Sequence, residues 1–306
     1  MTLPTTAKPV GNTRLFAASI EEQILLSVHL LGKPTAAQLF RLYQDQVGTL
    51  RQMQGILRRL SSGPDRMLNV INPMDIAKPI RSLPFIYLDT TRSRRLIEQL
   101  FGVPFRRVLP VPSRDWRFLR HDVEMVDELI SFELTARWLG IPFGYEPHFN
   151  ASGEPIYPKV TIHNDGLTHK LRPQPDKTLV VGDYHLIIEH DCGEEMIECG
   201  NIIRDATLGR KHLVYDQLFR SGALQTLGWN KTLVVYLIDS KRGKQSASRK
   251  RIKRCLENMS EEFMSVRLYF TDRQSFVGSN DNVATHQFVR GDKRALQLPC
   301  FSKSST

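Results

Sequence analysis

Acidic residues flank a predicted β-hairpin near the middle of this 306-residue chain. Residues 175–191 read PDKTLVVGDYHLIIEHD. Two short runs rich in β-branched and aromatic residues surround Gly182-Asp183, and a two-residue linker with glycine first is typical of a tight hairpin. Such a hairpin brings its two ends together, so we expect chemistry that uses several carboxylates at one place.

The register of the hairpin decides which acids meet. Pairing Val181 with Tyr184 places Asp176 opposite Glu189, at a position where side chains approach most closely. Asp191 points to the same face, because alternate residues of a strand share a face. Like charges opposite each other destabilise a sheet, so we expect a bound cation. Oxygen ligands favour Mg²⁺ or Mn²⁺ over zinc.

The same acids have a plainer interpretation, in which Asp176 and Asp191 are solvated strand ends beside an ordinary hairpin. A resemblance favours the metal site. The order Pro-Asp, hairpin, Glu-x-Asp resembles the metal site of the PD-(D/E)xK restriction-endonuclease-like fold. Residues 189–194 read EHDCGE, and a helix with lysine and tyrosine follows, which is most similar to the plasmid replication-relaxation proteins and the MobC-type relaxases. The lysine usual two residues after the second acid is Asp191 here, as expected in those relaxases.

The resemblance implies roles for two helical residues. The first core helix of such nucleases often contributes an acid beside the hairpin, which makes Glu124 a candidate fourth metal ligand. The missing strand lysine can be replaced from the next helix, and Lys211 would then supply the cation. Each residue also has an ordinary interpretation, Glu124 on the solvated face of an amphipathic helix and Lys211 as a surface lysine.

The elements that position these residues follow the order α-β-β-β-α-β, which matches the restriction-endonuclease-like core. We predict helices over 121–139 and 197–220, short strands over 143–149 and 159–162, the hairpin, and strands over 231–239 and 266–270. The strand at 231–239 is continuously apolar, as expected at the centre of a sheet covered on both faces. The fold class is therefore α/β (α+β).

Residues 19–102 predict a separate domain of three helices followed by a two-stranded ribbon, the winged helix-turn-helix pattern. Ser19, with Glu22 three residues on, forms a capping-box pattern. The third helix, 49–60, would be the recognition helix. It exposes side chains suited to base edges and phosphates: Arg51, Gln52, Gln54, Arg58 and Arg59. The alternative is a helical domain whose basic face is only solvated or mediates dimerisation.

The remaining segments complete the predicted domain organisation. Residues 1–18 read as a flexible leader, 103–120 as a basic, proline-rich linker, and 121–306 as the nuclease domain. Residues 241–254 contain eight Lys or Arg and no acid, which is typical of a solvated or nucleic-acid-facing surface. Its candidate DNA-binding residues are Lys250, Arg251, Lys253 and Arg254.

Composition supports a polyanionic partner. The chain has 42 Lys and Arg against 32 Asp and Glu, a net charge of +10. Such an excess favours nucleic acid first and an anionic membrane surface second. No apolar run approaches the length of a membrane span, and no secretory signal is visible. The four cysteines form no Cys-x-x-Cys pair, so we expect a reduced, cytoplasmic protein without a zinc finger.

These observations predict a DNA-processing protein. The resemblance implies Mg²⁺- or Mn²⁺-dependent nicking of plasmid DNA at an origin of transfer, with double-stranded and nicked plasmid DNA as partners alongside accessory relaxosome or coupling proteins. A covalent tyrosyl intermediate is not required by metal chemistry, although Tyr215 is the best-placed tyrosine. Two alternatives stay open: a non-catalytic plasmid replication or transcription regulator, and a transposon end-cleaving nuclease that makes double-strand cuts.

Overall fold

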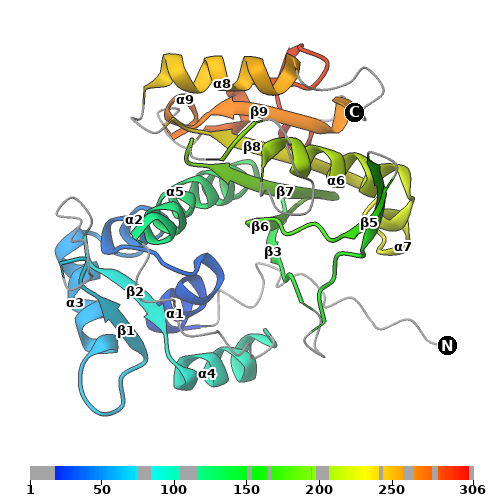
Figure 1. Ribbon diagram of the computed structural model, residues 1–306. Helices are drawn as coiled ribbons and strands as arrows, with labels where there is room; N and C mark the ends of the chain where they lie inside the picture. Colours follow the sequence, from blue (N-terminus) through cyan, green and yellow to red (C-terminus); the bar gives the residue numbers. More distant parts are fainter. Residues whose placement is uncertain are drawn as a thin grey trace. The chain divides into compact units, whose positions relative to one another are not determined.

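The chain forms two compact units, Met1–Leu134 and Thr135–Thr306, which we describe separately (Figure 1). The computed structural model describes residues 18–74, 84–103, 116–149, 154–164, 167–193, 195–197, 207–240, 244–257, 265–277 and 282–302. The boundary between the units falls inside helix α5 (Trp116–Leu139). This helix begins within the segment that we predicted as a linker, whose residues 104–115 lie outside the described part.

The first unit contains three helices, a two-stranded antiparallel sheet and a fourth helix. These are α1 (Ile20–Leu31), α2 (Ala36–Leu42), α3 (Leu50–Ser61), β1 (Leu68–Ile71), β2 (Ile86–Asp89) and α4 (Thr91–Phe101). Ser19, Thr35 and Thr49 each cap a helix, and each completes a capping box with the residue three positions later. These caps satisfy backbone N–H groups that have no partner inside the helix. The predicted element order is confirmed, while the winged-helix assignment stays a prediction.

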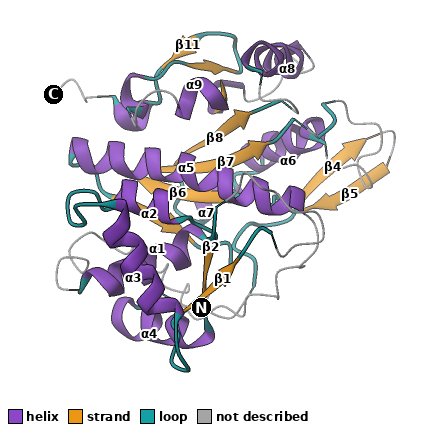
Figure 2. Ribbon diagram, turned by 90° about the vertical axis from the view of Figure 1, so that its left-hand side faces the viewer, coloured by secondary structure: helices purple, strands orange, loops and turns teal. Residues whose placement is uncertain are grey.

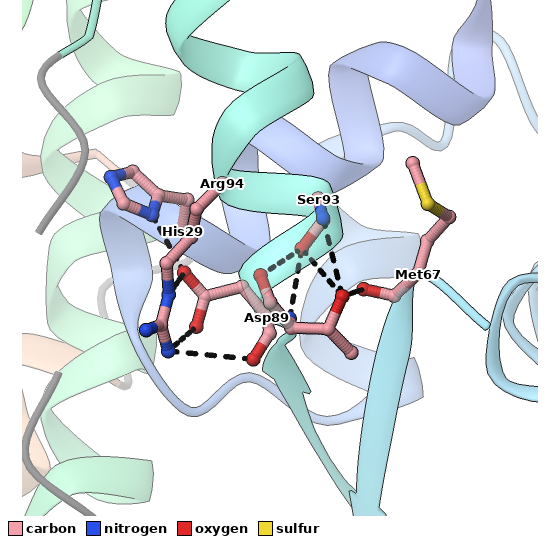
Figure 3. Close-up of polar contacts among 6 residues, drawn as sticks. His29, Met67, Asp89, Ser93 and Arg94 are labelled. Carbon is pink, nitrogen blue, oxygen red and sulfur yellow. Dashed lines mark hydrogen bonds and ion pairs between the residues drawn. The ribbon is translucent and has the colours of Figure 1, made fainter. Parts of the chain in front are cut away.

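Asp89 connects three elements of the first unit (Figure 3). His29 Nδ1, on α1, lies 2.7 Å from Asp89 Oδ2. Arg94, on α4, donates from Nε to Oδ2 and from Nη2 to Oδ1, each at 2.7 Å. Burial alone would raise the pKa of Asp89, but the hydrogen bonds and charges of His29 and Arg94 outweigh burial and hold this pKa below its usual value.

We expect Asp89→Ala to destabilise the first unit by about 3 kcal/mol, because it removes one partner of a largely buried ion pair. A carboxyl whose pKa is lower in the folded than in the unfolded state stabilises the fold above its unfolded pKa, and this stabilisation is lost as the pH falls through the folded pKa. Wild-type stability should therefore decrease below about pH 4 more steeply than that of the variant. Urea unfolding followed by circular dichroism at neutral and acidic pH measures both effects.

The matched control is Asp65→Ala, which removes an acid that pairs with Arg92 on the same helix α4. The Asp65 side chain is 78% exposed, so its ion pair should contribute less than about 1 kcal/mol. Equal losses of stability for the two variants would contradict a structural role for the Asp89 cluster.

A mixed sheet forms the second unit, with the strand order β11-β10-β9-β8-β7-β6-β3 within the described residues. β7, β8 and β9 are parallel, and the outer pairs are antiparallel. The strands are β3 (Phe143–Glu146), β6 (Lys177–Val181), β7 (Tyr184–Asp191), β8 (Lys231–Ile238), β9 (Leu268–Asp272), β10 (Phe288–Arg290) and β11 (Ala295–Leu296). A separate hairpin consists of β4 (Val160–Asn164) and β5 (Leu167–Leu171). The mixed α/β class predicted from the sequence is confirmed.

Two helices, α6 (Leu208–Arg220) and α8 (Gln245–Glu257), pack on one face of this sheet (Figures 1 and 2). Side chains of both helices join residues of β7, β8 and β9 in one hydrophobic core, in which Tyr236 and Phe270 stack with ring centroids 4.8 Å apart. Two short helices, α7 (Ala223–Thr226) and α9 (Arg273–Val277), complete the described helices of the unit. The face of β7 that carries its odd-numbered residues therefore lies beneath α6 and α8.

Two predictions for this unit were wrong in detail. We expected a helix from about residue 197, whereas α6 begins at Leu208 with Thr207 as its N-cap; residues 198–206 lie outside the described part. We also expected the strand over 266–270 to be the last one, whereas β10 and β11 add to the edge of β9. These strands have three and two residues, too few for a period-2 pattern to be visible. Among the described helices, none is long and apolar enough to cross a membrane.

Candidate active site

The β6–β7 hairpin has the predicted register. Val181 pairs with Tyr184, and Gly182 in the turn has a φ of 60°, which favours glycine. The ladder continues to Lys177 and Ile188, one residue short of the predicted pair of acids. Asp176 lies just before β6, and its carboxylate accepts a hydrogen bond of 2.8 Å from the backbone N–H of His190. The neighbouring strand therefore holds Asp176 in place.

Glu189, on β7, is buried, with 1% of its surface exposed. Lys211 Nζ lies 2.8 Å from its Oε2, and the Tyr215 hydroxyl donates a hydrogen bond to its Oε1. Both partners stand on α6, four residues apart and so on one face of the helix. Burial raises the pKa of Glu189 to about 7; Lys211 opposes this rise, and the charge of Asp176 adds to it.

Lys211 also lies against a second acid, because its Nζ is 2.9 Å from Glu195 Oε1. Burial lowers the pKa of Lys211, but the charges of Glu189, Glu195 and Asp176 outweigh burial and raise it above its usual value. Lys211 is therefore charged at neutral pH. Lys211 lies beside Glu189 and Glu195, and its catalytic role stays a prediction. Sequence reasoning missed Glu195, because only the path of the chain after β7 returns it to this place.

Asp191 is likewise buried, and it pairs with a different cation. Its Oδ1 accepts a hydrogen bond of 2.9 Å from the backbone N–H of Gly193, and Arg251 Nε donates to its Oδ2. Arg251 Nη2 donates to the backbone carbonyl of Glu195. Arg251, which we predicted to contact DNA, thus points into the unit and is 15% exposed. Lys250, Lys253 and Arg254 are exposed on the same helix.

We call Asp176, Glu189, Asp191 and Glu195 the carboxylate cluster. Its oxygen donors are of the kind that Mg²⁺ and Mn²⁺ prefer. Glu195 Oε2 is buried and accepts no hydrogen bond from the described residues, so it retains capacity for a ligand. The three predicted ligands do not bring one oxygen each within 4.8 Å of one another. The donor chemistry fits either ion, although Lys211 and Arg251 already neutralise two of the acids.

The other predicted site residues lie on other elements. Glu124 stands on α5 within the first unit and pairs with Arg120 at 2.7 Å, so its role as a fourth ligand stays a prediction. The five candidate DNA-reading residues of α3 are all exposed, while Met53, Ile56 and Leu57 form its buried face. Leu50, the first residue of this helix, is apolar but 37% exposed.

One further acid near the carboxylate cluster, Glu146, was not predicted from the sequence. Glu146, on β3, pairs across the sheet with Thr178, whose hydroxyl lies 2.6 Å from the Tyr157 hydroxyl. Burial raises the pKa of Glu146 to about 7, and the charges of Glu146 and Glu189 both raise the pKa of Tyr157. The only indication of Glu146 in the sequence was an acid at the end of an apolar strand. Its partners Thr178 and Tyr157 could not be identified from the sequence, because they lie too far away along the chain.

Comparison with known proteins gives no match to a family model, a curated protein or a solved structure. The likeness to relaxases therefore remains a resemblance of the hairpin motif. The chemistry of the site follows from its side chains alone: a partly buried lysine and a partly buried arginine contact buried carboxylates at one end of a hairpin.

Proposed function

We propose that this protein is a Mg²⁺- or Mn²⁺-dependent DNA endonuclease that nicks plasmid DNA. The observation that carries the proposal is that Asp176, Glu189 and Lys211 converge at one end of the β6–β7 hairpin. The element order gives further support. β7, β6 and β3 are antiparallel neighbours in the sheet, with the separate β4–β5 hairpin between β3 and β6 in the chain, and β8 follows α6 to lie parallel to β7. This arrangement is the one expected for a restriction-endonuclease-like core.

In this proposal Asp176, Glu189 and Asp191 would hold the metal ion, which requires that their carboxylates move closer together than they lie here. A Mg²⁺ or Mn²⁺ ion held there would supply an activated water and stabilise negative charge on a phosphate. Lys211 contacts Glu189, one of these acids, and its charge would stabilise the scissile phosphate. Tyr215 donates a hydrogen bond to Glu189 and is 1% exposed, so its role is to orient that carboxylate.

Incubation with supercoiled plasmid that carries the DNA flanking the gene, with and without Mn²⁺, tests this function. We expect open circles that form only with Mn²⁺ and disappear when EDTA is added. Linear products would instead indicate the double-strand cuts of a transposon end-cleaving nuclease. Plasmid that stays supercoiled with both Mn²⁺ and Mg²⁺ would reject the endonuclease proposal.

In this proposal, helix α3 of the first unit recognises the DNA sequence. Arg51→Ala combined with Gln54→Ala should cost about 1–3 kcal/mol for each base that is no longer read, which competition with unrelated DNA measures. Gln52 is left unchanged, because its side chain accepts a hydrogen bond of 3.0 Å from the Thr49 backbone and caps the helix. Arg95→Ala, an exposed arginine on α4, controls for the loss of charge. Equal loss of affinity for all sequences would reject base reading by α3.

One observation favours a second candidate, a non-catalytic DNA-binding regulator. Lys211 and Arg251 already neutralise Glu189 and Asp191, so the cluster can be stable without a metal ion. The two candidates differ in their response to metal. A ligand that binds the folded state raises its stability, so Mn²⁺ should raise the melting temperature of a metal-dependent nuclease and leave that of a metal-free regulator unchanged.

A further inference from the structure

A groove of about 880 Å³ lies beside α8, separate from the carboxylate cluster. One face of α8 lines it with Arg249, Ile252, Lys253 and Leu256, residues at helical spacing. The rest of its lining comes from the end of β9, from α9 and from residues 285–293. Its volume is in the range of ligand-binding sites.

The base of this α8 groove is apolar. Ile252 and Leu256 are buried, and Phe270 is fully covered and stacks on Tyr236. Val289, on β10, is partly buried and packs against the same core. An apolar strip at the base of a groove favours a ligand that has an uncharged part.

The edges of the groove carry basic side chains, and two of these pair with acids only at distances longer than a hydrogen bond. The side chains of Arg249 and Lys253 are 65% and 77% exposed. Arg249 Nε lies 3.6 Å from Asp272 Oδ2, and Lys253 Nζ lies 3.6 Å from Glu257 Oε1, both longer than a hydrogen bond. Lys253 and Glu257 form an exposed ion pair, which contributes little to stability, so a phosphate can replace the carboxylate of Glu257. Lys293 is exposed on the segment that closes the groove.

We propose that the α8 groove binds unpaired nucleotides of a DNA strand, with bases on the apolar strip and phosphates at Arg249, Lys253 and Lys293. A duplex keeps its bases stacked inside, so only an unpaired strand can cover an apolar strip with bases. Arg249 and Lys253 stand four residues apart, about 6 Å along the helix, which suits separate phosphates along a backbone. α8 as a whole carries five basic residues and one acid, which complements a polyanion.

Two polar features add hydrogen-bonding groups to the groove. His286 Nε2 lies 2.7 Å from Thr271 Oγ1, and burial lowers the pKa of His286, so this ring is neutral at pH 7. Gln287 is exposed beside it and offers both a donor and an acceptor to a base edge. The inference rests on the proposed function in one respect, that the strand belongs to nicked DNA. Helix α8 connects the groove with the carboxylate cluster, because Arg251 on this helix contacts Asp191 of the cluster.

Fluorescence anisotropy with the full-length protein in EDTA tests this inference. The probes are a short labelled oligothymidylate, an oligonucleotide of the same length built only of abasic sites, and an unrelated duplex. We expect oligothymidylate to bind the wild type at least about fivefold more tightly than the abasic strand, because base contacts add to the phosphate contacts. Lys253→Glu combined with Lys293→Glu should weaken binding of the oligothymidylate by about tenfold or more.

The matched control, Lys170→Glu combined with Lys231→Glu, makes the same change of charge at exposed positions of the second unit outside the groove. It should weaken binding no more than about twofold. Equal binding of the thymidylate and abasic strands by the wild type, equal losses in the two double variants, or competition by an acidic peptide as strong as by oligothymidylate would each overturn the proposal.

This assay contains no free metal ion, so its outcome is independent of the nuclease chemistry. Base-dependent binding by a protein that never nicks plasmid would support the groove and reject the endonuclease. Nicking by a protein that binds abasic and thymidylate strands equally would reject the groove alone.

Discussion

Glu189→Gln is expected to reduce Mn²⁺-dependent nicking by roughly 100-fold or more while DNA binding is retained. A factor of 100 corresponds to about 3 kcal/mol of transition-state stabilisation, within the range that a metal ion supplies. Glutamine keeps the volume of the buried side chain and can still accept the hydrogen bond of Tyr215, but it lacks the charge that holds a divalent cation. Asp176→Asn should have the same effect. The measurements are the initial rate of supercoil loss and the anisotropy of labelled plasmid fragments.

Two variants make this test specific. Asp183→Asn removes an acid from the turn of the same hairpin, where it is 66% exposed, and should leave nicking unchanged. Tyr215→Phe removes the hydroxyl that orients Glu189 and should reduce the rate far less than Glu189→Gln. Mn²⁺ should raise the melting temperature of the wild type and of Asp183→Asn, but not of Glu189→Gln. A Tyr215→Phe protein without activity, beside an active Glu189→Gln protein, would exclude the metal site.

Lys211→Met is expected to lower the stability of the second unit by about 3–5 kcal/mol, because one partner of a buried ion pair is lost and Glu189 and Glu195 keep no cation beside them. For a unit of this size the loss corresponds to a decrease of roughly 10 °C in melting temperature. Methionine retains most of the packing volume of lysine, so the effect reports the charge. Calorimetry at pH 7.5 measures it.

The pairing of Lys211 with Glu189 can be separated from packing by a double variant. Lys211→Met combined with Glu189→Gln should be more stable than Lys211→Met alone, since the buried carboxylate that had lost its cation is gone. Lys231→Met, which removes a 53% exposed lysine paired with Asp183, should change stability by less than about 1 kcal/mol. If the stability losses of Lys211→Met and Glu189→Gln measured singly add up to that of the double variant, the ion pair is not a stabilising contact.

Local sequence was sufficient for the hairpin and for the helices of the first unit. The register of β6 and β7 depends on Gly182 in the turn and on the short apolar runs on either side of it, both of which act over neighbouring residues. The N-caps at Ser19 and Thr49 depend on hydrogen bonds to a residue three positions away. The buried strand β8 was visible because it is central in the sheet and apolar on both faces.

Only the tertiary structure decided which cation meets which acid. Arg251 and Lys253 both belong to one basic run, yet α8 turns Arg251 toward Asp191 and leaves Lys253 in solvent, because residues two apart on a helix do not share a face. Glu195 reaches Lys211 through the path of the chain between β7 and α6. Such contacts join residues distant in sequence, and their energy depends on burial that develops only when the sheet and its covering helices pack together.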